Sequence, residues 1–105
     1  MERKKDSKLN SFVRKLKAHY PDAKIFLFGS RAGEDFFLTS DYDIIVVSEK
    51  FEGINFFKRT EKIYDYWVDD LALDVFCYTS KEFDEKKQKI GFLSEAMNNA
   101  ILVSA

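Results

Sequence analysis

Three short apolar runs most strongly limit how this chain can fold. They cover residues 24–28, 42–48 and 72–78, and each is rich in β-branched or aromatic residues. Runs of this length and composition are typical of buried strands. The segments between them carry apolar residues at three- and four-residue intervals, which is typical of amphipathic helices. The alternation predicts an α/β (α+β) fold, in which helices pack on a small mixed β-sheet.

The helices are expected before, between and after these strands. The first has an apolar stripe from Leu9 to Tyr20, with Ser7 as its N-cap and Pro21 preventing its continuation. A long second helix is expected over residues 55–69, capped by Asn55. The other expected elements are a short helix at 30–35, a loop at 36–40, a helix from 80 that continues after 91 to 97, and an edge strand at 101–103.

Composition limits the possible partners of the chain. A length of 105 residues fits one domain, residues 1–105. The formal net charge of -1 disfavours a long nucleic acid as partner, because such proteins usually carry a basic excess. No apolar run approaches the roughly 20 residues that span a bilayer. With one cysteine, Cys77, no internal disulfide can form, so we expect a cytoplasmic protein without a membrane partner.

The dipeptide Gly29-Ser30 follows the first predicted strand and precedes a predicted short helix. Glycine lets the backbone approach a ligand closely, and a helix N-terminus offers unpaired N–H groups to an anion. The pattern indicates a phosphate-binding turn. The alternative is an ordinary turn, because Gly-Ser is a common turn dipeptide.

Asp41 and Asp43 enter the second predicted strand on either side of Tyr42. Residues two apart on a strand point to the same face, so two carboxylates lie side by side. Their repulsion would be relieved by a divalent cation, and Mg²⁺ prefers carboxylates together with substrate phosphates. The alternative is that two solvated aspartates cap the strand end.

Asp74 lies within the third predicted strand, in the run Leu73-Asp74-Val75. An aspartate among apolar strand residues is costly to bury unless it is paired or binds a metal. If the second and third strands are neighbours, Asp74 faces the same site as Asp41 and Asp43. The alternative is a salt bridge from Asp74 to a nearby lysine or arginine.

Together these motifs resemble the DNA polymerase β-like nucleotidyltransferase superfamily, and within it the minimal nucleotidyltransferases. The resemblance rests on Gly29-Ser30-Arg31-Ala32, then Ser40-Asp41-Tyr42-Asp43-Ile44, then Leu73-Asp74-Val75. It covers residues 24–78 and implies the nucleotidyltransferase fold. The chain departs from the family at Gly33 and Glu34, where members often carry an arginine and a glycine.

The resemblance also implies roles for these residues. Asp41, Asp43 and Asp74 would be the catalytic residues and would hold two Mg²⁺ ions, with Mn²⁺ as a substitute. ATP would be the substrate, with Gly29 and Ser30 at its β- and γ-phosphates. For Arg31 two interpretations stay open: contact with phosphate, or pairing with Glu34 or Asp35.

The resemblance further implies a partner protein. Minimal nucleotidyltransferases are typically encoded beside a small helical HEPN ribonuclease toxin, which suggests an antitoxin that transfers AMP to a hydroxyl of that toxin. The resemblance thus implies a metal-dependent enzyme of the protein adenylyltransferase type, for which a homo- or hetero-oligomer is a possible state. The alternative is a non-catalytic module that neutralises the helical partner by contact. A nucleotidyltransferase acting on RNA or an antibiotic is a weaker third hypothesis.

Two reactive residues are assigned structural roles. His19 ends the first predicted helix, where a cation interacts favourably with the helix dipole. Cys77 lies three residues beyond Asp74, so strand alternation puts it on the opposite face, as a small buried apolar residue.

Overall fold

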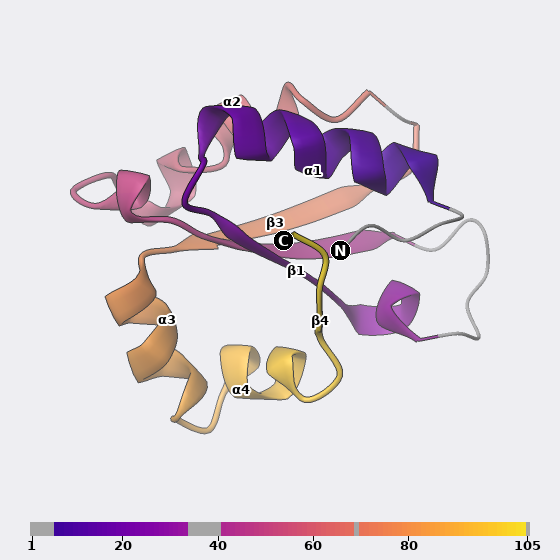
Figure 1. The fold of residues 1–105 in the computed structure, drawn as a ribbon. Coiled ribbons are helices and arrows are strands. Elements are labelled where there is room, and N and C mark those ends of the chain that lie inside the picture. The colour runs from indigo at the N-terminus through magenta and orange to yellow at the C-terminus, as the bar shows by residue number, and fades with distance from the viewer. Residues whose placement is uncertain (1–5, 34–40, 69, 105) are drawn as a thin grey trace.

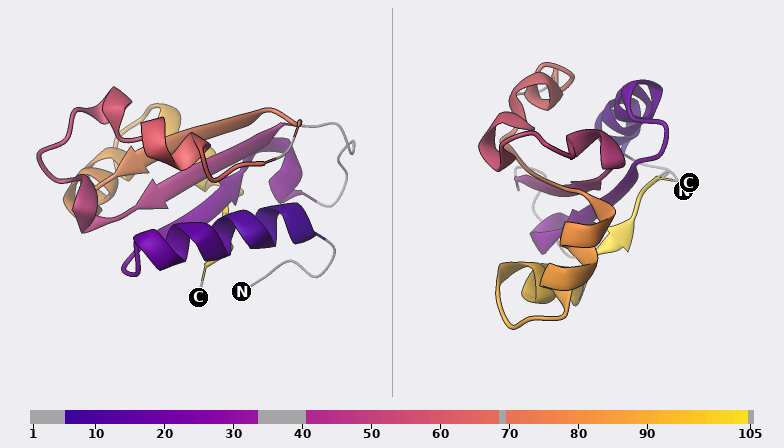
Figure 2. Two further views of the ribbon diagram at one scale, coloured as in Figure 1. Left: turned by 90° about the horizontal axis from the view of Figure 1, so that it is seen from above. Right: turned by 90° about the vertical axis from the view of Figure 1, so that its left-hand side faces the viewer.

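The chain builds a four-stranded sheet with helices on both of its faces (Figure 1). The computed structural model describes residues 6–33, 41–68 and 70–104. Helices α1 and α2 cover one face of the sheet, and α3 and α4 cover the other, as the end-on view in Figure 2 shows. The predicted α/β architecture is confirmed.

The sheet is mixed and has the order β3-β2-β1-β4. Its strands are β1 (Lys24–Phe28), β2 (Tyr42–Val47), β3 (Leu73–Tyr78) and β4 (Ile101–Leu102). Strand β1 pairs antiparallel with β2 and β4, whereas β2 and β3 are parallel. All four predicted strands are therefore present, and β4 is the expected edge strand.

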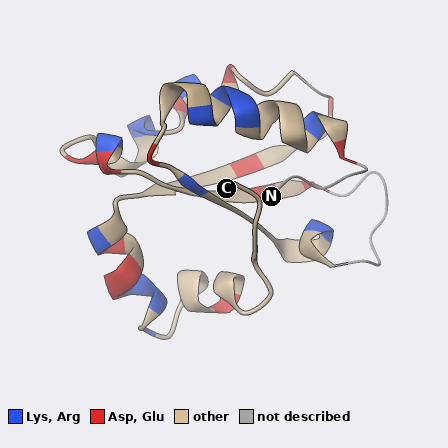
Figure 3. Ribbon diagram, in the orientation of Figure 1, with Lys and Arg blue, Asp and Glu red and all other residues tan. Residues whose placement is uncertain are grey.

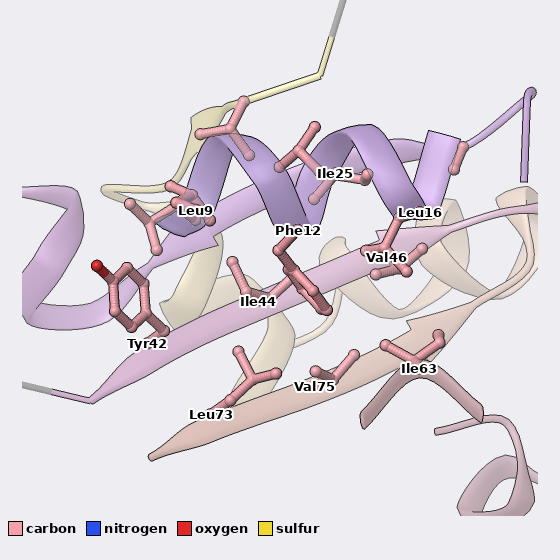
Figure 4. Packing of buried hydrophobic residues seen from close by; sticks show 14 of the residues in the cluster. Leu9, Phe12, Leu16, Ile25, Tyr42, Ile44, Val46, Ile63, Leu73 and Val75 are labelled. Atoms are coloured by element: carbon pink, nitrogen blue, oxygen red, sulfur yellow. The ribbon is translucent and has the colours of Figure 1, made fainter. Parts of the chain in front are cut away.

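Helix α1 (Ser7–His19) packs its apolar stripe on one face of the sheet. Alternation along β2 sends Tyr42, Ile44 and Val46 to this side, where they meet Leu9 and Phe12 of α1 (Figure 4). The predicted helix is confirmed, but its N-cap is Asp6 instead of Ser7. The Asp6 carboxylate accepts a hydrogen bond of 3.0 Å from the Leu9 backbone N–H, and Ser7 is instead the first residue of the helix.

On the opposite face, α3 (Ser80–Lys87) and α4 (Phe92–Met97) cover a second apolar cluster. Thr79 and Glu82 form a reciprocal capping box at the start of α3. This cluster consists of Phe28, Ile45, Val47, Tyr78, Phe83 and Leu93. The prediction of a helix from Ser80 that continues after Gly91 is confirmed as these two helices.

The connection between β2 and β3 differs from the predicted long helix. Its described residues form three short helical turns: η2 (Glu49–Phe51), η3 (Phe56–Lys58) and α2 (Glu61–Tyr64). Asn55 does act as a cap, since it accepts from the Phe57 backbone N–H at 3.0 Å. The apolar spacing was misleading because Phe57 and Val68 are 81% and 80% exposed, so they do not belong to one buried stripe.

The same connection protects the open edge of β3. The Tyr64 hydroxyl accepts a hydrogen bond of 3.1 Å from the Val75 N–H, and the Arg59 guanidinium donates at 3.2 Å to the Cys77 carbonyl. Side chains thus satisfy edge groups that would otherwise be free to pair with another strand. The short turns bring both side chains to this edge.

Arg59 is expected to be a major source of stability. Its guanidinium also donates to the Ile54 carbonyl and, through both terminal nitrogens, to Glu82. We predict that Arg59→Ala lowers the free energy of unfolding by about 2–3 kcal/mol, less than for a fully buried pair because the Glu82 side chain is 35% exposed. Denaturant unfolding measures this loss, and an unchanged midpoint would contradict it.

The acid dependence of this stability has a defined sign. The bond from Arg59 lowers the pKa of Glu82 from 4.5 to about 2. A lowered folded-state pKa contributes stability that is present above pH 4.5 and disappears as the pH falls toward about 2. The stability difference between wild type and Arg59→Ala should therefore shrink over that interval.

Two further observations complete the fold. Turn η1 (Gly29–Ala32) follows β1, where the short helix was expected to begin. Residues 34–40, which include the expected loop, lie outside the described residues. No helix in the described part of the chain combines the length and apolar character needed to cross a membrane.

Candidate active site

Three chain segments meet at one end of the sheet. Strand β1 ends there and continues into η1, while β2 and β3 both begin there. Because β2 and β3 are parallel, their first residues lie beside each other. The pairing register sets Phe28 opposite Asp43, and Asp43 opposite Asp74.

Asp43 and Asp74 point to the same face of the sheet. Their strand neighbours Tyr42, Ile44 and Leu73 belong to the core under α1, so alternation directs the two carboxylates to the α3–α4 side. In-register residues on neighbouring strands have backbones about 4.8 Å apart. Figure 3 shows acidic positions on both strands. The predicted juxtaposition of these two aspartates is therefore present.

The electrostatics of Asp43 reflect this crowding. Partial burial raises the pKa of Asp43, and the negative charges of Asp74 and then Asp41 raise it further. Asp41, just before β2, thus acts on the same site. Among the residues that the structure describes, no group of three or more His, Cys, Asp or Glu side chains is close enough to hold a metal ion.

The environment of Asp74 corrects one argument from the sequence. Asp74 is exposed, so it does not bear the burial cost expected of an aspartate in an apolar strand. Strand β3 lies at the edge of the sheet, with a strand neighbour on one side only. What marks Asp74 as a candidate is its register with Asp43.

Gly29 lies directly against the Asp43 carboxylate. It has a φ of 74°, in the left-handed region that favours glycine. A Cβ added to Gly29 would overlap Asp43 Oδ2, so even alanine would displace the carboxylate. Ser30 follows in η1 and is exposed. The Gly29-Ser30 turn and the aspartates therefore form one continuous site.

Arg31 is buried on the other side of the sheet, with only 5% of its surface exposed. Its Nη1 donates to the Tyr42 hydroxyl at 2.9 Å, and its guanidinium stacks over the Tyr42 ring at 4.1 Å. It also lies 3.9 Å from the Asp6 carboxylate. These contacts support an internal role for Arg31; the partners expected for it, Glu34 and Asp35, lie outside the described residues.

Tyr42 and Asp6 were missed as contributors to the site. The Tyr42 hydroxyl donates to the Asp6 carboxylate at 3.0 Å, which links the start of α1 to the strand that carries Asp43. Strand alternation within Asp41-Tyr42-Asp43 could have predicted that Tyr42 points away from the carboxylates. Its partners come from distant parts of the chain and could not be predicted from spacing.

The two residues assigned structural roles have them. His19 ends α1 and stacks on Tyr66 with ring centroids 4.7 Å apart. Cys77 is fully buried on the α1 face, as predicted, and burial raises the pKa of its thiol to about 12. A thiol with this pKa is not a nucleophile at neutral pH.

Comparisons with known proteins agree with this geometry. Residues 9–99 match the family described as nucleotidyltransferase domain. A candidate nucleotidyltransferase from Sulfolobus solfataricus has a similar structure, with a TM-score of 0.63 and 22% identity, over 90% of this chain and 74% of that one. A second candidate nucleotidyltransferase gives a TM-score of 0.48 and 25% identity, over 76% of this chain and 84% of that one.

No curated protein matches the chain in a sequence search. The Sulfolobus solfataricus structure supports the fold, and the family match identifies the domain. Because this match covers most of the chain and includes Gly29, Asp43 and Asp74, the protein belongs to the nucleotidyltransferase domain family.

Proposed function

We propose that this domain transfers AMP from ATP to a hydroxyl group of a partner protein, in a reaction that requires divalent metal ions. The proposal rests mainly on the register of Asp43 with Asp74 beside Gly29. The carboxylate oxygens of Asp43 and Asp74 therefore lie next to the Gly29 backbone, which a ligand can approach closely. A nucleoside triphosphate with its metal ions needs both kinds of group.

The residues present fit Mg²⁺. This ion usually binds one or two carboxylates and completes its shell with substrate phosphates and water. Asp43 and Asp74 supply two carboxylates, and the charge of Asp41 acts on Asp43, whose pKa it raises. Mn²⁺ accepts the same oxygen ligands. When bound, these ions would neutralise the triphosphate and lower the pKa of the acceptor hydroxyl.

The protein's own residues would position the reacting groups. Gly29 lets the backbone approach the phosphates, and the exposed Ser30 hydroxyl can donate to a phosphate oxygen. In the reaction, the acceptor oxygen forms a bond to the α-phosphorus while the bond to pyrophosphate breaks. The hydroxyl proton leaves to solvent, so atoms and charge balance.

A protein acceptor is supported by the exposed apolar surface. Ile54, Phe57, Tyr64 and Val68 are large apolar side chains of the β2–β3 connection that remain exposed. Large apolar side chains left exposed in one connection of a small domain are available for a protein interface. We propose a small helical protein of the HEPN type as the partner, with the domain as its antitoxin.

One experiment tests both transfer and partner. The chain is co-expressed with the helical protein encoded beside its gene, purified by size exclusion and incubated with ATP labelled on the α-phosphate and Mg²⁺. We expect co-elution and label on the partner. Separate elution at micromolar concentration contradicts the antitoxin proposal. A stable complex that takes up no label favours the alternative, neutralisation by contact alone.

A further inference from the structure

A pocket of about 360 Å³ opens beside the candidate site, lined from the end of β1 and from helix α4 with the residues after it. This volume lies within the range of small-molecule pockets. Its lining consists of Phe28, Gly29, Phe92, Glu95, Ala96 and Asn99. Gly29 therefore belongs both to the pocket and to the Asp43 site, so one ligand can occupy both.

Helix α4 presents a single face to this pocket. Phe92, Glu95 and Ala96 line the pocket from one side of this helix, since Glu95 and Ala96 lie three and four positions after Phe92, and Asn99 joins them from the segment that follows the helix. The Phe92 ring packs against Phe28 and Phe76, with centroids 5.6 and 4.6 Å away. The Phe92 side chain is nevertheless 49% exposed, so part of a ring that its neighbours hold in place remains available to a ligand.

The chemistry of the lining excludes a phosphate and suits a planar base. None of the six lining residues is basic, and Glu95 is acidic, so an anion is repelled. Glu95 and Asn99 are exposed, and neither side chain has a hydrogen-bond partner among the described residues. A carboxylate accepts from an exocyclic amino group, and an asparagine amide can pair with the amino edge of adenine.

We propose that this pocket is the base-binding subsite of the nucleotide, with Phe92 stacking on the ring and Glu95 and Asn99 at its edge. The inference rests on the proposed function and extends it to nucleotide selectivity. The ligand class is a purine that carries an exocyclic amino group, and adenine fits both edge residues. Uracil is disfavoured because it is smaller and lacks that group.

Binding measurements on the full chain test the subsite. Calorimetric titration with ATP, UTP and inorganic triphosphate, each with Mg²⁺, is compared for wild type, Phe92→Leu and Asn99→Ala. Phe92→Leu keeps an apolar side chain but removes the ring. It should weaken the binding of ATP about tenfold and leave the affinity for inorganic triphosphate unchanged. Wild type should favour ATP over UTP about tenfold, and Asn99→Ala should remove most of that preference.

Matched controls and outcomes separate this inference from the proposed function. Ile90→Ala alters another exposed apolar side chain, outside the pocket, and should not change ATP affinity. If wild type binds ATP and triphosphate but Phe92→Leu binds ATP equally well, the base subsite is wrong and the proposed function stands. If Phe92→Leu weakens the binding of triphosphate as much as the binding of ATP, the base subsite is also wrong. If wild type binds no ATP, both fail.

Discussion

Asp74→Asn is expected to reduce transfer of AMP at least about a hundredfold, equivalent to about 2.7 kcal/mol of transition-state stabilisation, while ATP binding survives. The carboxylate in register with Asp43 would serve the acceptor hydroxyl, whereas Asp43 and Asp41 would hold the nucleotide. Asparagine has nearly the same shape but lacks the charge. Labelled transfer to the partner, at matched ATP saturation, measures the loss.

The exposure of Asp74 makes this test clean. An exposed side chain that loses its charge should leave the free energy of unfolding nearly unchanged, so reduced transfer would not reflect a damaged fold. Asp84→Asn is the matched control, because Asp84 is an exposed aspartate of α3 paired only at the surface with Lys87. Equal transfer by wild type and Asp74→Asn would refute the role of Asp74.

Gly29→Ala is expected to abolish most transfer at a small cost in stability. The alanine Cβ would overlap Asp43 Oδ2, and a carboxylate at the end of a side chain yields by rotating away. The left-handed φ of 74° adds about 1–2 kcal/mol of strain. Displacement of Asp43 should therefore harm ATP binding and transfer far more than it harms folding. Thermal melting and labelled transfer measure the two effects.

Gly53 offers a matched control for this prediction. It has a φ of 78°, but a Cβ there would meet no atom within 4 Å. Gly53→Ala should therefore cause the same loss of melting temperature as Gly29→Ala and leave transfer intact. If both variants lose transfer equally, the effect of Gly29 comes from backbone strain and the contact with Asp43 is irrelevant.

Local patterns were enough to predict much of the fold and the placement of the candidate site. The β-branched run after Asp43 and the apolar run around Val75 specify buried strands whatever surrounds them. Strand alternation then separates Asp43 from its apolar neighbours. The position of Gly29 at the end of β1 follows from the same pattern.

The segment between β2 and β3 could not be predicted in this way. Its apolar spacing resembles a helix, yet Arg59 and Tyr64 satisfy backbone groups of the β3 edge, a contact set by tertiary structure. The exposure of Asp74 depends on which strand lies at the edge. The internal placement of the Arg31 side chain depends on its contacts with Asp6 and Tyr42. Such partners come from distant parts of the chain.

The most direct test of the central claim is the change in melting temperature that ATP and Mg²⁺ cause in wild type and in Asp43→Asn. A ligand that binds only the folded state stabilises it by about 2.7 kcal/mol at a concentration of a hundred times its Kd. We predict a rise of several degrees for wild type, and loss of most of that rise in Asp43→Asn. An equal rise in the two proteins would show that ATP binds elsewhere and would contradict the account.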